Sequence, residues 1–221
     1  MASTTGQRSS RSADRSSRAG RRQEYIDAAA KVFYLRGYDS ATIGNIAESL
    51  DVTKAALYYY IESKEDLLFE IIREMHLLNM ANLERCREIG GKARSRLWHY
   101  FCGHTLVNLE NIEKSTVVYR DLAHLSQDRR KEIIALRDET QQFVRELLNQ
   151  AVAEKSVCEK LNVEFASIEM FTTANAVYSW FRADGSAQPV EAAERMADYI
   201  IGGVSCTGPD DLSCPRHHPP K

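Results

Sequence analysis

The hydrophobic residues of this chain recur with a period of about 3.6 residues, which places them along one face of successive α-helices. In the first such stretch, residues 22–35, one face carries four apolar side chains: Ile26, Ala29, Ala30 and Phe33. Gly37 then occupies a position typical of the end of a helix. No proline occurs before Pro189, and no run of alternating β-branched residues indicates a strand. The pattern predicts an all-α protein of about nine helices.

Two short helices joined by a tight turn are predicted after residue 40. The first begins at Thr42, whose hydroxyl can cap free backbone N–H groups, and its apolar face consists of Ile43, Ile46, Ala47 and Leu50. Asp51 tolerates the left-handed backbone that a tight turn requires. Thr53 can cap the second helix, which covers residues 54–60. This succession predicts a helix-turn-helix.

Longer helices follow. The sequence Ser63-Lys64-Glu65-Asp66 has the form of a capping box, and it opens a helix that continues to about Ile89, before Gly90-Gly91. Further helices are predicted over residues 93–111, 116–125, 128–153, 163–181 and 189–201.

The helix over residues 54–60 is too short to be stable without its neighbours. Its inward face must therefore pack through Ala56, Leu57 and Tyr60. The opposite face stays free and carries four polar side chains: Thr53, Lys54, Tyr58 and Tyr59. Hydroxyls and a cation can hydrogen-bond phosphates or base edges, so this face suits a helix that enters the major groove of DNA.

The spacing of this segment is specific. Its motif residues are Gly37-Tyr38, Thr42, Ile46-Ala47, Val52-Thr53, Leu57-Tyr58-Tyr59-Tyr60 and Lys64-x-x-Leu67. At this spacing the segment resembles the DNA-binding domain of the TetR family, the tetracycline-repressor-like regulators. The resemblance implies phosphate contacts for Thr42, Tyr58 and Lys64. It implies groove-facing positions for Thr53, Lys54, Ala55 and Tyr59, while Tyr60 is the candidate for inward packing.

Asp51 departs from the family pattern, which usually has glycine there, so the turn should be slightly more strained. The resemblance further implies that the remaining helices form a ligand-binding and dimerisation domain. In that domain the last two long helices pair with their symmetry mates in a four-helix bundle. The small and apolar residues suited to this packing are Phe165, Ile168, Phe171, Ala174, Tyr178, Ala193, Met196, Ala197, Ile200 and Ile201.

A homodimer would hold two reading helices about 34 to 36 Å apart and so read a palindromic operator in double-stranded DNA. A small-molecule effector would release the operator by favouring a dimer with the wrong separation, with the fourth helix pivoting when the ligand pushes on residues 75–79. On this interpretation the chain has four parts: a disordered Arg/Ser-rich arm (1–20), the DNA-binding domain (21–66), the ligand-binding and dimerisation domain (67–203) and a flexible tail (204–221).

The effector site is indicated by polar residues at helix-interior spacing. The candidates are His104, Tyr119, Arg120, Arg137, Gln141 and Tyr178. Apolar surroundings with one or two cations suit an apolar ligand that carries a carboxylate, a phosphate or a thioester-linked nucleotide. Two alternatives stay open: His104 as a core histidine, and Arg120 as the partner of Asp121 or of a helix terminus. Residues 117–121 and 147–150 are also similar to TetR regulators of fatty-acid, steroid and aromatic-acid catabolism, some of which sense acyl-CoA thioesters.

The net charge of −2 conceals an asymmetry. Up to Lys64 there are ten Lys and Arg against seven Asp and Glu, whereas the rest of the chain has nineteen against twenty-four. The arginines of the first 22 residues are Arg8, Arg11, Arg15, Arg18, Arg21 and Arg22. Such an arm can contact phosphates or the minor groove, or it can be a solvated tail.

The five cysteines are widely spaced, without a C-x-x-C pair or a histidine at metal-ligand spacing, which favours buried or idle thiols. Metal binding by Cys214, His217 and His218 in the proline-rich tail is the less favoured alternative to a disordered end. We therefore expect no metal and no cofactor. The absence of an apolar leader or of an apolar run of about eighteen residues predicts a cytoplasmic protein with no membrane span.

The sequence disfavours two other classes of function. An enzyme is disfavoured because the chain has no nucleophile elbow, HExxH, P-loop or paired-carboxylate signature. A helical protein-interaction module without specific DNA binding would leave the arginine excess and the polar face of residues 53–59 without a role.

Overall fold

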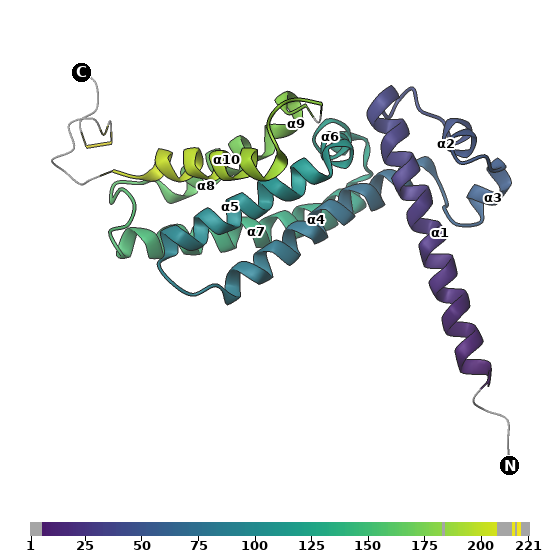
Figure 1. Ribbon diagram of the computed structural model, residues 1–221, viewed down its shortest axis with the longest axis horizontal. Coiled ribbons are helices and arrows are strands. Elements are labelled where there is room, and N and C mark those ends of the chain that lie inside the picture. The colour runs from purple at the N-terminus through teal and green to yellow at the C-terminus, as the bar shows by residue number, and fades with distance from the viewer. Residues whose placement is uncertain (1–5, 183, 207–213, 215, 218–221) are drawn as a thin grey trace, which may run out of the picture.

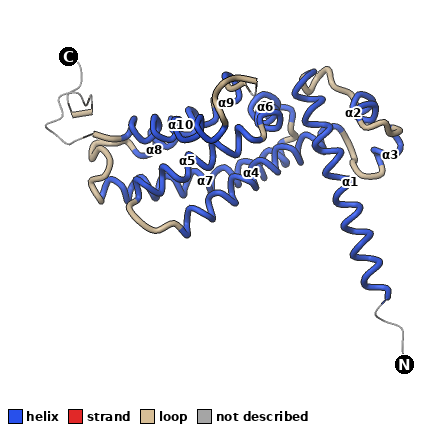
Figure 2. Tube along the Cα trace, viewed as in Figure 1, coloured by secondary structure: helices blue, strands red, loops and turns tan. Residues whose placement is uncertain are grey.

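The computed structural model describes residues 6–182, 184–206, 214 and 216–217, and the side chains from residue 18 onward. The predicted all-α class is confirmed, since every regular element within the described residues is helical (Figure 2). The α-helices are α1 (Gly6–Arg36), α2 (Ile43–Ser49), α3 (Lys54–Tyr58), α4 (Lys64–Glu88), α5 (Ala93–Glu110), α6 (Ile112–Asp121), α7 (Gln127–Ala153), α8 (Val163–Asn175), α9 (Val177–Trp180) and α10 (Pro189–Val204). A 3-10 turn, η1 (Leu122–His124), follows α6.

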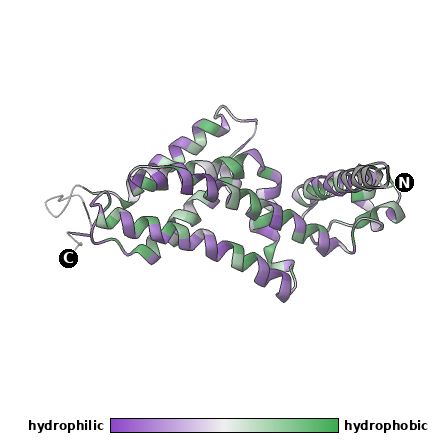
Figure 3. Ribbon diagram, turned by 90° about the horizontal axis from the view of Figure 1, so that it is seen from below, coloured by the Kyte–Doolittle hydropathy of each residue, from purple (hydrophilic) through white to green (hydrophobic). Residues whose placement is uncertain are grey.

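The molecule is elongated, with α1 to α3 at one end and α4 to α10 forming a longer body (Figure 1). We call α1 to α3 the head. Helices α4, α5, α7, α8 and α10 run roughly along the long axis, whereas α6 crosses it (Figure 1), and polar and apolar residues alternate around the helices (Figure 3). Within the described residues, no helix is both long enough and apolar enough to span a bilayer.

The helix ends of the head follow from their capping residues. Thr42 accepts a hydrogen bond from the backbone N–H of Asn45 at 3.2 Å, and Thr53 accepts one from Ala56 at 3.1 Å. Asp51 takes the left-handed backbone that the turn requires, with φ of 53°. Ser63 caps α4 by accepting from the backbone N–H of Asp66 at 3.0 Å. The short elements therefore begin where the sequence predicts.

The first helix is longer than predicted. Residues 6–20 were expected to be a disordered arm, whereas α1 begins at Gly6 and its N-terminal half projects away from the rest of the molecule (Figure 1). Once the packed segment up to Arg36 has formed a helix, each added turn avoids the cost of nucleation, and no proline interrupts residues 6–20. The arm is therefore a helical extension of the head.

The head has no separate core. Tyr25 and Phe33 of α1, Leu57 of α3 and Ile72 of α4 belong to one buried cluster that continues to Ile133 of α7. A second cluster joins α4, α5, α7, α8 and α10. The head is thus packed directly on the body, so a shift in α4, α6 or α7 changes the packing of the head.

The C-terminal helices differ from the prediction in two respects. The helix predicted over residues 163–181 is divided at Ala176 into α8 and α9, which gives ten α-helices in the described residues. The small face of α10, expected to pair with a second subunit, packs inside the chain against α5: Ala193, Ala197, Ile200 and Ile201 are all at most 4% exposed. Small side chains allow close approach of helices, and here α5 of the same chain packs against the small face of α10.

Candidate DNA-binding surface and effector pocket

The short helix α3 presents the face that the sequence predicts. Thr53, Lys54 and Ala55 are exposed at its start. Tyr58 is 53% exposed and Tyr59 is 67% exposed, although both are large aromatic side chains. An exposed row of hydroxyls and one ammonium on a protruding helix is suited to phosphates and base edges.

The opposite face of α3 holds the helix on the head. Leu57 is fully buried. Tyr60, predicted to pack inward, contacts the ring of Tyr25 edge-on with centroids 5.2 Å apart. Tyr59 stays outside this contact, and the Arg18 guanidinium lies 5.1 Å from the centroid of its ring. Arg18, near the end of the arginine arm, therefore lies beside α3.

Thr42 and Lys64 flank α3, and they behave differently. Thr42 is exposed, and its side chain already caps α2. The Lys64 ammonium donates to the carbonyl oxygens of Tyr38 at 2.9 Å and Ala41 at 3.0 Å, and it lies 4.2 Å from the centroid of the Tyr38 ring. Lys64 therefore fastens the loop between α1 and α2 to the start of α4, and its third N–H remains for another acceptor.

A pocket of about 350 Å³ lies between α4, α5, α6, α7 and α8. Four of the six predicted effector residues line it: His104, Tyr119, Arg137 and Gln141. The other lining residues are His76, Asn79, Val118, Leu122, Thr140, Ile168, Phe171, Thr172 and Asn175. A mixed lining of this kind, enclosed by helices, is typical of small-molecule sites.

The polar floor of the pocket is centred on Asn175. Its Oδ1 accepts hydrogen bonds from the Tyr119 hydroxyl at 2.6 Å and from His104 Nε2 at 2.8 Å. With Nε2 donating, Nδ1 of His104 is an acceptor, and no described residue donates to it. Oδ1 of Asn79 is buried and without a donor in the same way. Both acceptors belong to pocket residues but are themselves buried.

Both histidines of the pocket are neutral at pH 7. Burial lowers the pKa of His104 to about 4, against the opposing effect of its hydrogen bond with Asn175. Burial, and then the positive charge of Arg137, lowers the pKa of His76 to about 4. Arg137 is exposed, so it supplies a positive charge at the surface rather than inside the pocket.

Two predicted effector residues lie outside the lining. Tyr178 stacks on Tyr119 with centroids 5.2 Å apart and so supports the pocket wall from behind. Arg120 points toward the head: its guanidinium donates to the carbonyl of Phe33 at 2.6 Å and to a carboxylate oxygen of Asp121 at 2.8 Å. The alternative for Arg120, pairing with Asp121 and a helix terminus, is the arrangement found.

Further ion pairs join the head to the pocket helices and the pocket helices to one another. Arg129 of α7 pairs with Asp66 of α4 at 3.4 Å. Lys114 of α6 pairs with Asp27 of α1 at 2.6 Å and with Glu74 of α4 at 2.7 Å. Because α4 begins beside α3 and lines the pocket twelve residues later at His76, it connects the two sites directly.

Sequence reasoning missed several pocket residues. His76 and Asn79 could have been noticed as polar residues one turn apart on a largely apolar helix. Asn175 gives no such signal, since an asparagine near a helix end is usually a cap. Phe171 was assigned to the dimer bundle, but it lines the pocket and lies 5.5 Å from the His104 ring.

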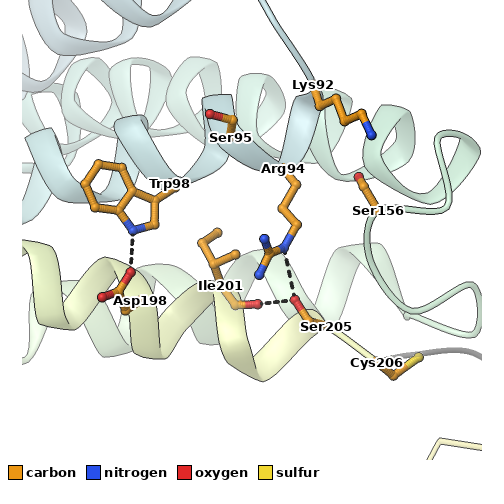
Figure 4. A pocket seen from close by; sticks show the side chains of 9 residues that line it. All are labelled: Lys92, Arg94, Ser95, Trp98, Ser156, Asp198, Ile201, Ser205 and Cys206. Carbon is orange, nitrogen blue, oxygen red and sulfur yellow. Dashed lines mark hydrogen bonds between the residues drawn. The ribbon is translucent and has the colours of Figure 1, made fainter. Parts of the chain in front are cut away.

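A second, larger pocket of about 680 Å³ lies between α5 and α10 (Figure 4), at the end of the body away from the head (Figure 1). Its side chains pair with one another: Trp98 donates to Asp198 at 2.7 Å and Arg94 donates to Ser205 at 3.2 Å. This pocket touches neither α4 nor α6, so a ligand there would have no direct path to the head.

The head presents one exposed face of α3, and it is packed on a helical body that contains a pocket. This arrangement is typical of a DNA-binding transcription regulator. Comparison with known families agrees with this class of protein. The profile described as "Bacterial regulatory proteins, tetR family" matches residues 26–71, and the profile described as "Tetracyclin repressor-like, C-terminal domain" matches residues 90–204. The chain belongs to the TetR family. It is a DNA-binding regulator rather than an enzyme or a helical protein-interaction module.

Individual relatives are distant but cover nearly the whole chain. The transcriptional repressor KstR2 of Rhodococcus jostii is 24% identical over 194 residues, which is 87% of this chain and 95% of the relative. The TetR regulator PfmR of Thermus thermophilus has a TM-score of 0.75 at 28% identity, over 82% of this chain and 99% of that one. AibR, solved in complex with isovaleryl coenzyme A and operator DNA, has a TM-score of 0.71 at 24% identity. The match covers 83% of this chain and 97% of AibR.

Proposed function

We propose that this regulator is a homodimeric repressor that binds a palindromic operator through α3 and is released by an acyl-CoA thioester or a related apolar acid. The observation that carries the DNA-binding assignment is the outward row of Thr53, Lys54, Ala55 and Tyr59 on a helix whose other face is buried. Because bacterial DNA lies in the cytoplasm, the regulator works there.

The phosphate contacts come from the edges of the same surface. Thr42 is exposed at the start of α2, Tyr58 is exposed at the end of α3, and the third N–H of Lys64 adds a donor at the start of α4. These contacts fix the orientation of α3 on the duplex, while the groove-facing residues discriminate between bases.

The dimer is supported by the apolar residues that α8 and α10 leave uncovered. Phe165 is 59% exposed and Ile168 is 49% exposed on α8, as expected of a pairing helix. On α10 the exposed residues are Val190, Tyr199, Gly202 and Gly203, rather than the alanines that pack on α5. This face of α8 and α10 is the proposed dimer surface.

The effector is proposed from the lining of the pocket. An apolar acyl group fits between Phe171, Val118 and Leu122. Arg137 at the surface then suits the phosphates of a nucleotide that remains outside. The relative solved with isovaleryl coenzyme A supports this chemistry by analogy.

The DNA-binding proposal is tested by selecting sites from a random duplex pool with the full-length protein. We expect an inverted repeat, and fluorescence anisotropy should show that Lys54→Ala and Tyr59→Ala each weaken binding to it by about 5- to 100-fold. Lys64→Ala should weaken all duplexes and reduce the salt dependence by about one phosphate contact, because it removes a charge without base specificity.

The matched control is Lys160→Ala, which removes the same charge from an exposed position in the connection between α7 and α8. It should leave operator affinity unchanged. The effector is tested on the same complex with a panel of acyl-CoA thioesters beginning with isovaleryl coenzyme A, with free coenzyme A and the free acids as controls. Unchanged binding by both α3 variants would contradict the DNA-binding surface, whereas failure of the whole panel would contradict only the ligand class.

A further inference from the structure

Three separate segments meet at the end of the body farthest from the head. Cys158 lies in the connection between α7 and α8, Cys206 follows the end of α10, and Cys214 and His217 belong to the tail. Their four ligand atoms all lie within 4.8 Å of one another. Cys206 is at the edge of the pocket between α5 and α10, on the chain that leaves α10 (Figure 4).

The separations match a tetrahedral metal site. The Sγ atoms of Cys158 and Cys214 are 3.9 Å apart, and Cys158 Sγ is 3.6 Å from His217 Nε2. In a tetrahedron with bonds of about 2.3 Å to sulfur and about 2.0 to 2.1 Å to nitrogen, sulfur atoms lie roughly 3.8 Å apart and sulfur and nitrogen roughly 3.6 Å apart. The four side chains can therefore bind one ion with little movement.

Other hydrogen bonds hold these segments together independently of the four candidate ligands. The N–H of Cys158 donates to the carbonyl of Val204 at 3.0 Å, and the Arg216 guanidinium donates to the carbonyl of Gly203 at 2.7 Å. The backbone N–H of His217 also donates to the carbonyl of Cys214 at 3.1 Å. These hydrogen bonds keep the three segments together.

We propose that Cys158, Cys206, Cys214 and His217 form a structural site for Zn²⁺. Three thiolates and an imidazole are a soft ligand set, which favours zinc over calcium or magnesium. Four protein ligands also leave no open position for substrate, as in structural rather than catalytic zinc sites. The ion joins the connection before α8 to the end of α10, and so it fixes the two helices of the proposed dimer surface relative to each other.

This proposal replaces the expectation of idle thiols and a free tail. That expectation overlooked the spacing of Cys214 and His217, a C-x-x-H pair, and it could not foresee that Cys158, 56 residues earlier than Cys214, lies beside them. His218, named with them, lies outside the described residues. A Cys158–Cys214 disulfide is the competing chemistry, but a separation of 3.9 Å is well beyond the bond length of about 2.05 Å.

The test uses the full-length protein, purified under reducing conditions, loaded with Zn²⁺ and dialysed against metal-free buffer. Mass spectrometry of the metal content should find about one zinc per chain. Co²⁺ in place of zinc should give tetrahedral d–d absorption and a thiolate-to-metal charge-transfer band. Cys214→Ser and Cys158→Ser should each lose most of the zinc, and with Co²⁺ the charge-transfer band should fall by about one third or more. Cys102→Ser, a change of the same kind on α5 outside the cluster, is the matched control and should retain both signals.

Three outcomes would overturn the proposal. One is a reduced protein that binds no zinc, and another is a Co²⁺ spectrum of octahedral type. The third is zinc content that both serine variants retain, which would show an adventitious ion only. Since Cys158 is buried and its variant could fail to fold, the Co²⁺ spectrum of the unaltered protein and the tail variant Cys214→Ser decide the question. Operator binding is measured separately, so loss of zinc without loss of DNA affinity leaves the DNA-binding assignment intact.

Discussion

Replacing Arg120 with alanine should destabilise the protein because the side chain fastens the pocket helix α6 to the end of α1. The guanidinium donates to the carbonyls of Phe33 at 2.6 Å and Tyr34 at 3.3 Å, and it forms two hydrogen bonds with Asp121. The side chain of Asp121 is 5% exposed, so its carboxylate would lose its cation while remaining buried.

The magnitude follows from these contacts. A hydrogen bond to a charged group contributes about 1.5 to 3 kcal/mol, but the Arg120 side chain is 37% exposed and water screens part of this. We therefore expect Arg120→Ala to lower the free energy of unfolding by about 2 kcal/mol. For a chain of this size, that loss corresponds to a Tm lower by roughly 4 to 8 °C.

Chemical denaturation and calorimetry measure the effect. Arg73→Ala is the control, because it removes an exposed ion pair with Glu132 and should cost at most about 0.5 kcal/mol. If Arg120 instead bound the effector, Arg120→Ala would weaken acyl-CoA binding and leave Tm unchanged. That combination would refute the assignment of Arg120 to the junction between head and body.

Three further effects are expected. The folded-state pKa values of His76 and His104 lie near 4, below the unfolded value of about 6.5. Their contribution to stability is therefore complete above pH 6.5 and is lost as the pH falls toward 4. His104→Gln should flatten the dependence of Tm on pH between these two values. Gly103→Ala should cost about 1 to 3 kcal/mol in denaturant titration, because a Cβ there would collide with the buried amide of Asn82. Leu57→Ala should cost about 2 to 5 kcal/mol and abolish specific operator binding, because α3 loses its only fully buried side chain; near-native stability would contradict the described packing.

Local sequence signals determined the head. Thr42, Asp51, Thr53 and Ser63 act through hydrogen bonds or backbone conformations that span at most three residues, so their consequences can be read without knowledge of the fold. The outward face of α3 followed for a related reason: once Leu57 is assigned to the core, the helical period fixes which residues lie opposite.

Tertiary packing decided which helix faces meet. The alanines of α10 have the same pattern whether they contact α5 or a second subunit, because hydrophobic periodicity identifies a buried face but not its partner. Arg120 illustrates the same limit, since a cation on a helix can serve a ligand or a helix end and only the crossing of α6 over α1 selects one.

The amino-acid sequence by itself therefore specified the helices, the DNA-binding motif and the family, since these depend on interactions between residues close along the chain. The tertiary structure decided which helices enclose the pocket, the junction at Arg120 and the cluster around Cys158, because each joins side chains separated by tens of residues. Such contacts depend on how whole helices pack, and no short segment encodes that packing.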